Sequence, residues 1–351
     1  MLKSLRVANF TVFEGADLEF SRGLNLFVGE NGVGKTHLLK LPYAVMAVMA
    51  EEGRRRGGRP TKALLQRRIA EKLVNVMRPE SLGRLARRRQ GRQRCEVAMR
   101  LAAPKERLAF DFATQSVSEV VVGRAPRQWM DHAPVFVPTR ELLSIYPGFA
   151  ALYDGHHVEF EETWRDTCQF LGAPTLKGPR ETHMGSLLEP LEELMDGRLV
   201  LDRNGRFYLR SLRKGGGRIE MPLVAEGVRK LGMLARLIAT GMLVDRSCLF
   251  WDEPETNLNP KLIRGVAETI LRLCAQGVQV FVATHSLFLL REFEILLRGA
   301  FLHERCRYFA LAHGANGVHV EQSDEIDDVD PLVLLDEDLL QSDRYLEQDV
   351  Q

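Results

Sequence analysis

The sequence predicts an α/β protein in which a mixed sheet carries helices on both faces and is extended by a helical lobe. A glycine-rich segment, residues 29–36, lies between an apolar strand and a helix, which is the context of a phosphate-binding loop. A second apolar strand, 248–251, ends in the acids Asp252 and Glu253. Such a strand is typical of a parallel sheet that is buried on both faces, and open α/β sheets bind ligands at its carboxyl end.

The composition is that of a folded protein. Of the 351 residues, 45% are hydrophobic and 27% are charged, so a sizeable core can form. No apolar run reaches about 18 residues and the N-terminus lacks the apolar block of a signal peptide, so we expect a cytoplasmic protein without membrane contact. The five cysteines are scattered and form no CxxC pair. We therefore expect free, buried thiols and neither disulfides nor a zinc site.

Apolar spacing predicts the elements of the first half of the chain. Residues 2–28 alternate as short strands, and a helix should follow the glycine-rich segment and end near Gly53. The stretch 61–100 is predicted to be helical and basic, with one buried apolar stripe. Further strands are predicted at 96–99, 108–112, 117–122 and 135–137.

The second half is predicted in the same way. Residues 140–197 are mainly helical, and Asn204-Gly205 between two alternating apolar runs indicates a hairpin with a two-residue type I′ turn. Beyond it, helices and strands alternate. The helices are predicted at 226–243, 260–275 and 286–297, and the strands at 248–251, 278–283, 308–312 and 318–320.

The glycine-rich segment fits the pattern GxxxxGK[ST]. It consists of Gly29, Glu30, Asn31, Gly32, Val33, Gly34, Lys35 and Thr36. Its glycines allow a tight turn whose N–H groups point at the β-phosphate of ATP, aided by the positive end of the following helix. Lys35 should bridge the β- and γ-phosphate oxygens, and the Thr36 hydroxyl should ligate Mg²⁺. His37, the next residue, is a further expected nucleotide contact.

A phosphate-binding loop needs a distant carboxylate, and the strand that ends in two acids supplies one. Asp252 should hold Mg²⁺. Because neighbouring residues of an extended chain point to opposite sides, Glu253 should face the γ-phosphate instead and polarise the attacking water.

The order of these motifs resembles that of the ABC-type ATPase heads of the SMC/RecF/OLD superfamily. The order is the glycine loop, Val224-Ala225-Glu226-Gly227, the Asp252-Glu253-Pro254 strand, and His285 after another apolar strand. The likeness covers nearly the whole chain and is greatest to compact prokaryotic AAA-family ATP-binding heads that lack coiled coils and a Toprim domain. It implies a P-loop NTPase fold of the ABC/SMC type, a D-loop at 255–259 that includes Asn257, and a switch role for His285 in reading the γ-phosphate.

Ala225, Glu226 and Gly227 occupy the place of the signature motif, where compact heads usually carry Ser-Glu-Gly. In the family that serine grips the γ-phosphate bound on the opposite subunit, so the resemblance implies an ATP-dependent, head-to-tail homodimer. Because Ala225 lacks the serine hydroxyl, a charge-assisted hydrogen bond of roughly 1.5–3 kcal/mol is lost. The Gly227 N–H and the helix dipole remain. We expect weaker or slower assembly. The alternative is that 224–227 is only a helix start.

Two other assignments follow from the resemblance. Residues 135–141 resemble the segment that joins the two lobes, at the place of the Q-loop but without its glutamine, so Arg140 and Glu141 are candidate sensors of nucleotide state. Phe10 or Phe13 is a candidate for stacking on adenine; the alternative for each is simple core.

Charge is distributed unevenly although the net charge is +1. Residues 51–100 hold 16 Lys and Arg against 5 Asp and Glu, whereas 321–351 hold 12 Asp and Glu against Arg344 alone. The stretch Arg54 to Arg100 is a candidate contact for DNA phosphates. The acidic tail is a candidate partner-docking segment, because apolar residues are interleaved with its acids: Leu332, Val333, Leu334, Leu335, Leu339, Leu340 and Tyr345. Solvated surfaces are the alternative for both.

These features leave three functions open and disfavour a transporter subunit, which would carry Leu-Ser-Gly-Gly-Gln. The first is an OLD-like or Septu-like phage-defence ATPase that controls a separate effector protein, since little chain follows the last strand. The second is a RecF-like ATPase of DNA repair. The third is a nucleotide-gated scaffold with weak turnover.

The predicted organisation has three parts. The ATP-binding core lobe comprises residues 1–139 and 245–322, with a basic insertion at about 53–100. The helical signature lobe comprises 140–244, and the acidic C-terminal tail 323–351.

Overall fold

A computed structural model gives the fold of the chain. It describes residues 1–87, 93–102, 106–156, 158–244, 246–299, 301, 305–315, 317–329, 340–341 and 344–345. Most of the acidic tail lies outside these residues, including Leu332, Val333, Leu334, Leu335 and Leu339. Leu340 and Tyr345 are described, and both are exposed.

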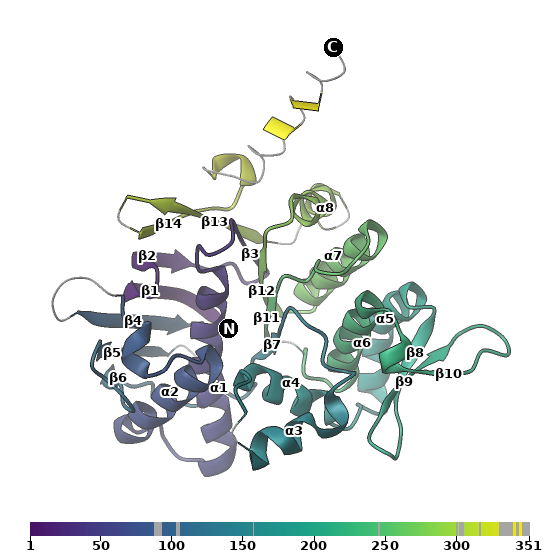
Figure 1. The fold of residues 1–351 in the computed structure, drawn as a ribbon, viewed down its shortest axis with the longest axis horizontal. Coiled ribbons are helices and arrows are strands. Elements are labelled where there is room, and N and C mark those ends of the chain that lie inside the picture. The colour runs from purple at the N-terminus through teal and green to yellow at the C-terminus, as the bar shows by residue number, and fades with distance from the viewer. Residues whose placement is uncertain are drawn as a thin grey trace.

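A six-stranded mixed sheet forms the centre of the molecule (Figure 1). Its strand order is β14-β13-β3-β12-β11-β7, and only β13 and β14 pair antiparallel. The strands are β3 (Leu24–Gly29), β7 (Val135–Val137), β11 (Cys248–Asp252), β12 (Gln279–Thr284), β13 (Cys306–Gly314) and β14 (Gly317–Ser323). Because β3, β11 and β12 are nearly continuous apolar runs, they occupy inner positions that are buried on both faces.

Alternate side chains of these inner strands enter two different hydrophobic cores. On β11, Leu249 and Trp251 pack on one side of the sheet, and Cys248 and Phe250 pack on the other. The period-2 geometry of a strand requires this alternation. The central sheet is therefore the shared wall between the two cores.

One face of the wall is covered by helix α1 (Lys35–Arg56) and by a second, antiparallel sheet. That sheet has the order β2-β1-β4-β5-β6. Its strands are β1 (Leu2–Phe10), β2 (Phe13–Glu19), β4 (Arg94–Leu101), β5 (Arg107–Ala113) and β6 (Val121–Arg124). Helix α2 (Lys62–Met77) packs against α1 and β6.

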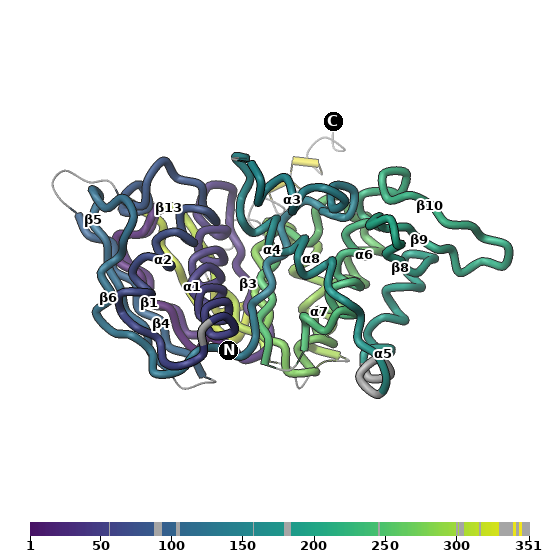
Figure 2. Tube along the Cα trace, turned by 90° about the horizontal axis from the view of Figure 1, so that it is seen from below, coloured from purple at the N-terminus to yellow at the C-terminus, as the bar shows by residue number. Residues whose placement is uncertain are grey.

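The other face carries the remaining helices. They are α3 (Tyr146–Gly155), α4 (Glu162–Gly172), α5 (Pro179–Leu194), α6 (Glu226–Ala239), α7 (Pro260–Ala275) and α8 (Leu287–Arg298). A small sheet of β8 (Gly197–Leu201), β9 (Phe207–Ser211) and β10 (Arg218–Glu220) extends this side. In both views it lies at the end of the molecule opposite the five-stranded sheet (Figure 2). Short 3-10 turns occur at Leu82–Leu85, Met221–Leu223 and Ile326–Asp328.

Three predicted elements need correction. The helical prediction at 61–100 holds only to Met77, because Arg78 adopts a left-handed conformation (φ 54°) before Pro79. The strand predicted at 117–122 is β6, which begins at Val121. The helix predicted to reach residue 243 ends at Ala239, where the Met242 N–H returns to the Leu237 carbonyl.

The hairpin at β8 and β9 exists, but its turn differs from the prediction. A type I′ turn needs positive φ at both central residues. Only Gly205 has it (φ 76°), and Asn204 does not. The Gly205 N–H donates to the Asp202 carbonyl, and the Asp202 N–H donates to the Arg206 carbonyl. The connection is therefore three residues long, and the expected two-residue turn is wrong.

Two compositional predictions are tested by the fold. All five cysteines are free and buried, as predicted. In the part of the chain that the structure describes, no helix has both the length and the apolar character needed to cross a membrane.

Candidate functional site

Three neighbouring strands carry the predicted site residues to one edge of the central sheet. β3 leads into the glycine loop, β12 ends immediately before His285, and β11 ends at Asp252. Their register aligns Thr284 with Val28 and Asp252 with Ala283. Because the three strands are parallel, their carboxyl ends meet at the same edge, which is where open α/β sheets bind ligands.

The glycine loop has a backbone that other residues would not accept. Gly34 has φ 89°, and a β-carbon there would lie 2.9 Å from the ring of Phe13. A β-carbon on Gly29 would lie 2.4 Å from the carbonyl oxygen of Leu311. Gly32 has φ 85° and open space around it. Two of the loop glycines thus pack closely against neighbouring residues, whereas Gly32 borders open space, which fits a phosphate cradle.

Lys35 lies over this loop. Its Nζ donates to the carbonyl oxygens of Gly29 and Glu30, each at 2.7 Å. Burial lowers the pKa of Lys35, and the carboxylates of Glu253 and Asp252 partly offset this effect. The ammonium group is held within the loop, where a phosphate oxygen would replace a carbonyl partner.

Thr36 and Asp252 meet directly. The Thr36 hydroxyl lies 3.0 Å from Oδ2 and 3.2 Å from Oδ1 of Asp252. Burial raises the pKa of Asp252 to about 6, although the Thr36 hydrogen bond and the nearby Lys40 oppose the shift. A hydroxyl and a carboxylate oxygen are hard ligands, and Mg²⁺ is commonly bound by one or two protein oxygens together with substrate phosphates. These residues therefore fit a magnesium–nucleotide.

Glu253 is held beside Asp252 by an unusual backbone. It has φ 47°, a left-handed conformation that costs a non-glycine residue about 1–3 kcal/mol. Its Oε1 lies 3.1 Å from His285 Nδ1, and its Oε2 accepts from the Thr256 hydroxyl at 3.3 Å. The structure thus brings Glu253 and His285 together, from two neighbouring strands. Both side chains are partly exposed, so water can reach them.

The segment after Glu253 is a compact turn. Glu255 is buried, and its Oε1 accepts from the Thr284 hydroxyl at 2.6 Å. Burial raises the pKa of Glu255. Asn257 is left-handed (φ 64°), and Asn259 caps α7 by accepting from the Leu262 N–H. The predicted D-loop is therefore ordered by the strand next to it and by the helix that follows.

The predicted signature segment lies on the other side of this turn. Ala225 occupies the N-cap of α6, which has no side-chain cap hydrogen bond, and Glu226 begins the helix. A β-carbon on Gly227 would lie 2.7 Å from the Asn257 carbonyl oxygen. Within one chain the segment thus packs against the D-loop.

The remaining predicted residues include His37, which follows Thr36 in α1. His37 Nδ1 lies 3.2 Å from the Thr11 hydroxyl, and burial lowers the pKa of His37. Phe10 and Phe13 are fully buried, so the core alternative holds and neither ring is available for adenine. Arg140 is exposed.

Glu141 is buried and forms an ion pair with Arg229 of α6 at 2.8 Å. Arg229 also donates to the carbonyl oxygens of Met221 and Val224. The segment that contains Glu141 is therefore tied to the start of α6, which the sequence pattern did not reveal.

Buried charges near the site were also missed. Lys40, one turn after Thr36, pairs with Glu161 just before α4. Lys230 of α6 is fully buried and donates to the main chain of the acidic turn. A lysine on a helix is typical of a solvated face, so neither burial is expected from the sequence, although Lys230 lies at apolar spacing from Gly227 and Leu234.

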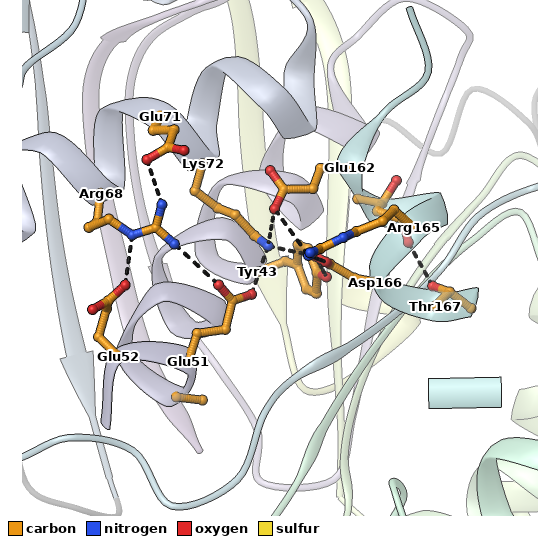
Figure 3. Close-up of polar contacts among 12 residues, drawn as sticks. Tyr43, Glu51, Glu52, Arg68, Glu71, Lys72, Glu162, Arg165, Asp166 and Thr167 are labelled. Carbon is orange, nitrogen blue, oxygen red and sulfur yellow. Dashed lines mark hydrogen bonds and ion pairs between the residues drawn. The ribbon is translucent and has the colours of Figure 1, made fainter. Parts of the chain in front are cut away.

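A larger cluster joins α2 to α4 (Figure 3). The Lys72 ammonium lies within 3.0 Å of carboxylates of Glu51, Glu162 and Asp166, and the Tyr43 hydroxyl donates to Asp166. Burial lowers the pKa of Lys72, but the three carboxylates outweigh it and the net pKa is raised. This basic residue is therefore internal.

Comparisons with known proteins agree with this geometry. The family model described as "AAA domain, putative AbiEii toxin, Type IV TA system" matches residues 153–291, and a model described as "AAA domain" matches residues 4–49. A DNA replication and repair protein RecF from Phocaeicola vulgatus is 46% identical over 43 residues. That match spans 12% of this chain and 12% of the RecF protein.

Solved structures show the same fold. A SmcHead bound to the C-winged helix domain of ScpA has a TM-score of 0.58 at 13% identity, covering 92% of this chain and 98% of that one. An Smc head domain with an extended coiled coil, bound to the C-terminal domain of ScpA from Pyrococcus furiosus, has a TM-score of 0.52 at 11% identity, covering 100% and 99%. The chain therefore has the fold of the SMC head domains, and parts of it match AAA-domain models and a RecF protein.

Proposed function

We propose that the chain binds ATP with Mg²⁺ at the glycine loop and hydrolyses it within a head-to-tail dimer. The observation that carries this proposal is the hydrogen bond between Thr36 and Asp252, which joins the loop to the acidic strand end. The pair of Glu253 and His285 lies at the same edge of the sheet. Binding and hydrolytic groups therefore share one site.

Each residue has a distinct task in this proposal. Lys35 and the loop N–H groups hold the phosphates, and Thr36 and Asp252 hold the metal. Mg²⁺, when bound, neutralises charge that develops on the phosphate oxygens. Glu253 accepts the proton of the attacking water, and His285 orients that carboxylate through Oε1.

The surface around the signature segment supports a dimer. Leu223, just before Val224 and Ala225, exposes 75% of its surface. A second subunit that covered this side chain would remove its apolar surface from water, which favours association. A second copy in head-to-tail arrangement would place the N-terminus of α6 over the partner's glycine loop, because a C2 interface pairs the same two surfaces twice.

The Glu253→Gln variant tests the hydrolysis proposal. It keeps the shape of the side chain but cannot accept the proton. We expect ATP turnover to fall by a hundredfold or more, ATP binding to persist, and an ATP-bound dimer to accumulate in analytical ultracentrifugation. Unchanged turnover in this variant would remove the role of Glu253, and a monomer at saturating ATP would remove the dimer.

We further propose that the ATP cycle controls a separate effector protein, as in OLD-like or Septu-like phage defence. The matched family description names a toxin of a type IV TA system, and one SMC head was solved bound to ScpA, so a head of this fold can engage a protein partner. This proposal includes the division of the chain into two lobes: a core lobe of residues 1–139 and 245–322, and a helical lobe of residues 140–244. The acidic tail is the segment that docks the effector. Deletion of 324–351 should abolish co-purification of the effector, and retained association would contradict tail docking.

A RecF-like DNA-binding function is the second candidate, and one surface favours it. The stretch Arg54–Arg100 is not one basic face, because Lys72 is internal and Arg68 pairs with Glu52 and Glu71. Instead, a cavity of about 730 Å³ collects exposed arginines from three segments. They are Arg54, Arg59, Arg127 and Arg246, and Trp129 and His132 line the same cavity.

Duplex binding measured at two salt concentrations tests this candidate. If the arginines neutralise phosphates, log affinity should fall by about 0.9 for each phosphate contact per tenfold rise in salt. Arg59→Glu and Arg127→Glu should lower both affinity and slope, whereas Arg203→Glu in the β8–β9 turn should not. If DNA binding is insensitive to salt, or if no DNA binds, control of a separate effector protein is the better account. A nucleotide-gated scaffold, which Ala225 favours, predicts ATP-dependent dimers with little turnover.

A further inference from the structure

The buried ammonium group of Lys230 donates to main-chain carbonyl oxygens, whereas a lysine usually faces solvent or pairs with a carboxylate. The Lys230 side chain is fully buried on α6, and its Nζ donates to the carbonyl oxygens of Glu253, at 3.0 Å, and Thr256, at 2.9 Å. Burial of an ammonium group is unfavourable unless its donors are satisfied. Burial lowers the pKa of Lys230 to about 8, and the carboxylates of Glu255, Glu226, Glu253 and Asp252 oppose this shift.

The turn that Lys230 contacts has a strained backbone. Glu253 (φ 47°) and Asn257 (φ 64°) are both left-handed without being glycine. Such conformations persist only where the surroundings hold them. The Thr256 N–H donates to the Glu253 carbonyl at 3.3 Å, and the Glu253 N–H donates to the Ala283 carbonyl at 2.9 Å. Lys230 supplies two further hydrogen bonds to the bend formed by residues 253–257, one to the Glu253 carbonyl and one to the Thr256 carbonyl.

The same face of α6 carries the signature residue. Gly227 and Lys230 are three positions apart, so they lie on one side of the helix. At Gly227 there is no room for a side chain against the Asn257 carbonyl oxygen. The first turn of α6 thus contacts the bend at Asn257, and its second turn contacts it at Glu253 and Thr256. The neighbouring Arg229 points elsewhere, to Glu141 and Met221.

We propose that Lys230 is a positioning residue that couples the start of the signature helix to the carboxylate of Glu253. This inference rests on the proposed ATPase function. When the N-terminus of α6 engages a nucleotide on a second copy, any shift of the helix moves the Lys230 ammonium, and with it the Glu253 peptide. The carboxylate then changes its alignment with His285. Lys230 is not among the residues that we assign to nucleotide or metal binding.

The Lys230→Met variant, with Lys261→Met as the matched control, tests the coupling. Methionine fills a similar volume without a donor, and Lys261 is exposed on the neighbouring helix α7. We expect Lys230→Met to bind ATP within about twofold of the unchanged protein, to hydrolyse it at least tenfold more slowly, and to show altered chemical shifts of the His285 ring by NMR. Lys261→Met should alter none of these.

Two outcomes would overturn the inference. In one, folded Lys230→Met hydrolyses ATP at the normal rate; in the other, its His285 resonances are unchanged. The NMR arm needs no turnover, so it decides the role of Lys230 even if the unchanged protein fails to hydrolyse ATP. Turnover that is present in the unchanged protein and lost in Glu253→Gln supports the proposed function independently of Lys230. Failure of one claim is therefore distinguishable from failure of the other.

Discussion

The hydroxyl of Thr36 lies 3.0 Å from Oδ2 of Asp252, although 216 positions separate the two residues. Thr36 is at the start of α1, and Asp252 is at the end of β11, two strands away from the glycine loop in the sheet. A contact of this kind requires strands β3, β12 and β11 to pair. It is the structural link between the glycine loop and the acidic residues.

We expect Asp252 to make magnesium binding sensitive to pH. Its pKa is raised to about 6 by burial, against about 3.9 in an unfolded chain. Between about pH 4 and 6 the folded protein therefore holds this proton and the unfolded chain does not, so the group's contribution to stability rises as pH falls. Mg²⁺ must displace the proton. We expect the apparent Mg²⁺ affinity in the presence of ATP to fall by up to tenfold per pH unit below 6.

Titration calorimetry between pH 5 and 7.5 measures this dependence, and Asp252→Asn is its control. The variant should bind Mg²⁺–ATP more weakly at every pH and with a flatter pH profile. A profile as steep as that of the unchanged protein would assign the pH dependence to another group.

A serine at position 225 should strengthen both the fold and the dimer. Ala225 is the N-cap of α6, and no side chain accepts a hydrogen bond there. Ala225→Ser supplies that acceptor, which stabilises a helix by about 1 kcal/mol. Urea unfolding should report the gain, and sedimentation with ATP should report a tighter dimer. Ala225→Val, which has no hydroxyl, should give neither. Equal dimer affinity in the serine variant would contradict a phosphate contact at this position.

Lys72 should be essential to the junction between α2 and α4. Lys72→Met leaves the carboxylates of Glu51, Glu162 and Asp166 facing one another without their shared cation. Loss of one partner of a buried cluster typically costs about 3–5 kcal/mol. The exposed pair Arg6 and Asp17 is the contrast, and Arg6→Met should cost less than about 1 kcal/mol. Similar losses in the two variants, measured by urea unfolding, would refute the distinction.

Local patterns predicted the elements whose structure depends on local sequence. Helix α7 runs over Pro260–Ala275, as apolar spacing predicts. Strand β11 differs from its prediction only by including Asp252. Where a single backbone conformation decides the outcome, as at Arg78 or in the turn at Asn204, the pattern was not sufficient.

The candidate site divides in the same way. The motif around Lys35 and the acids at the end of β11 are visible in the sequence because their chemistry requires particular residues at fixed spacing. Lys230 and Arg229 are not, because a lysine or arginine on a helix is typical of solvent exposure. Their burial arises only when the turn after Glu253 and the segment at Glu141 pack against α6. The apolar spacing of Lys230 was the one available signal.

The central claim is tested most directly by measuring the ATP affinity in the presence of Mg²⁺ and in the presence of EDTA. The measurement compares four proteins: the unchanged protein, Thr36→Val, Asp252→Asn and the double variant. If the glycine loop and the acidic strand hold one magnesium–nucleotide, Mg²⁺ should tighten ATP binding in the unchanged protein. Either single substitution should remove most of that gain, and the double variant should lose little more. A magnesium gain that persists in Asp252→Asn would contradict the shared site.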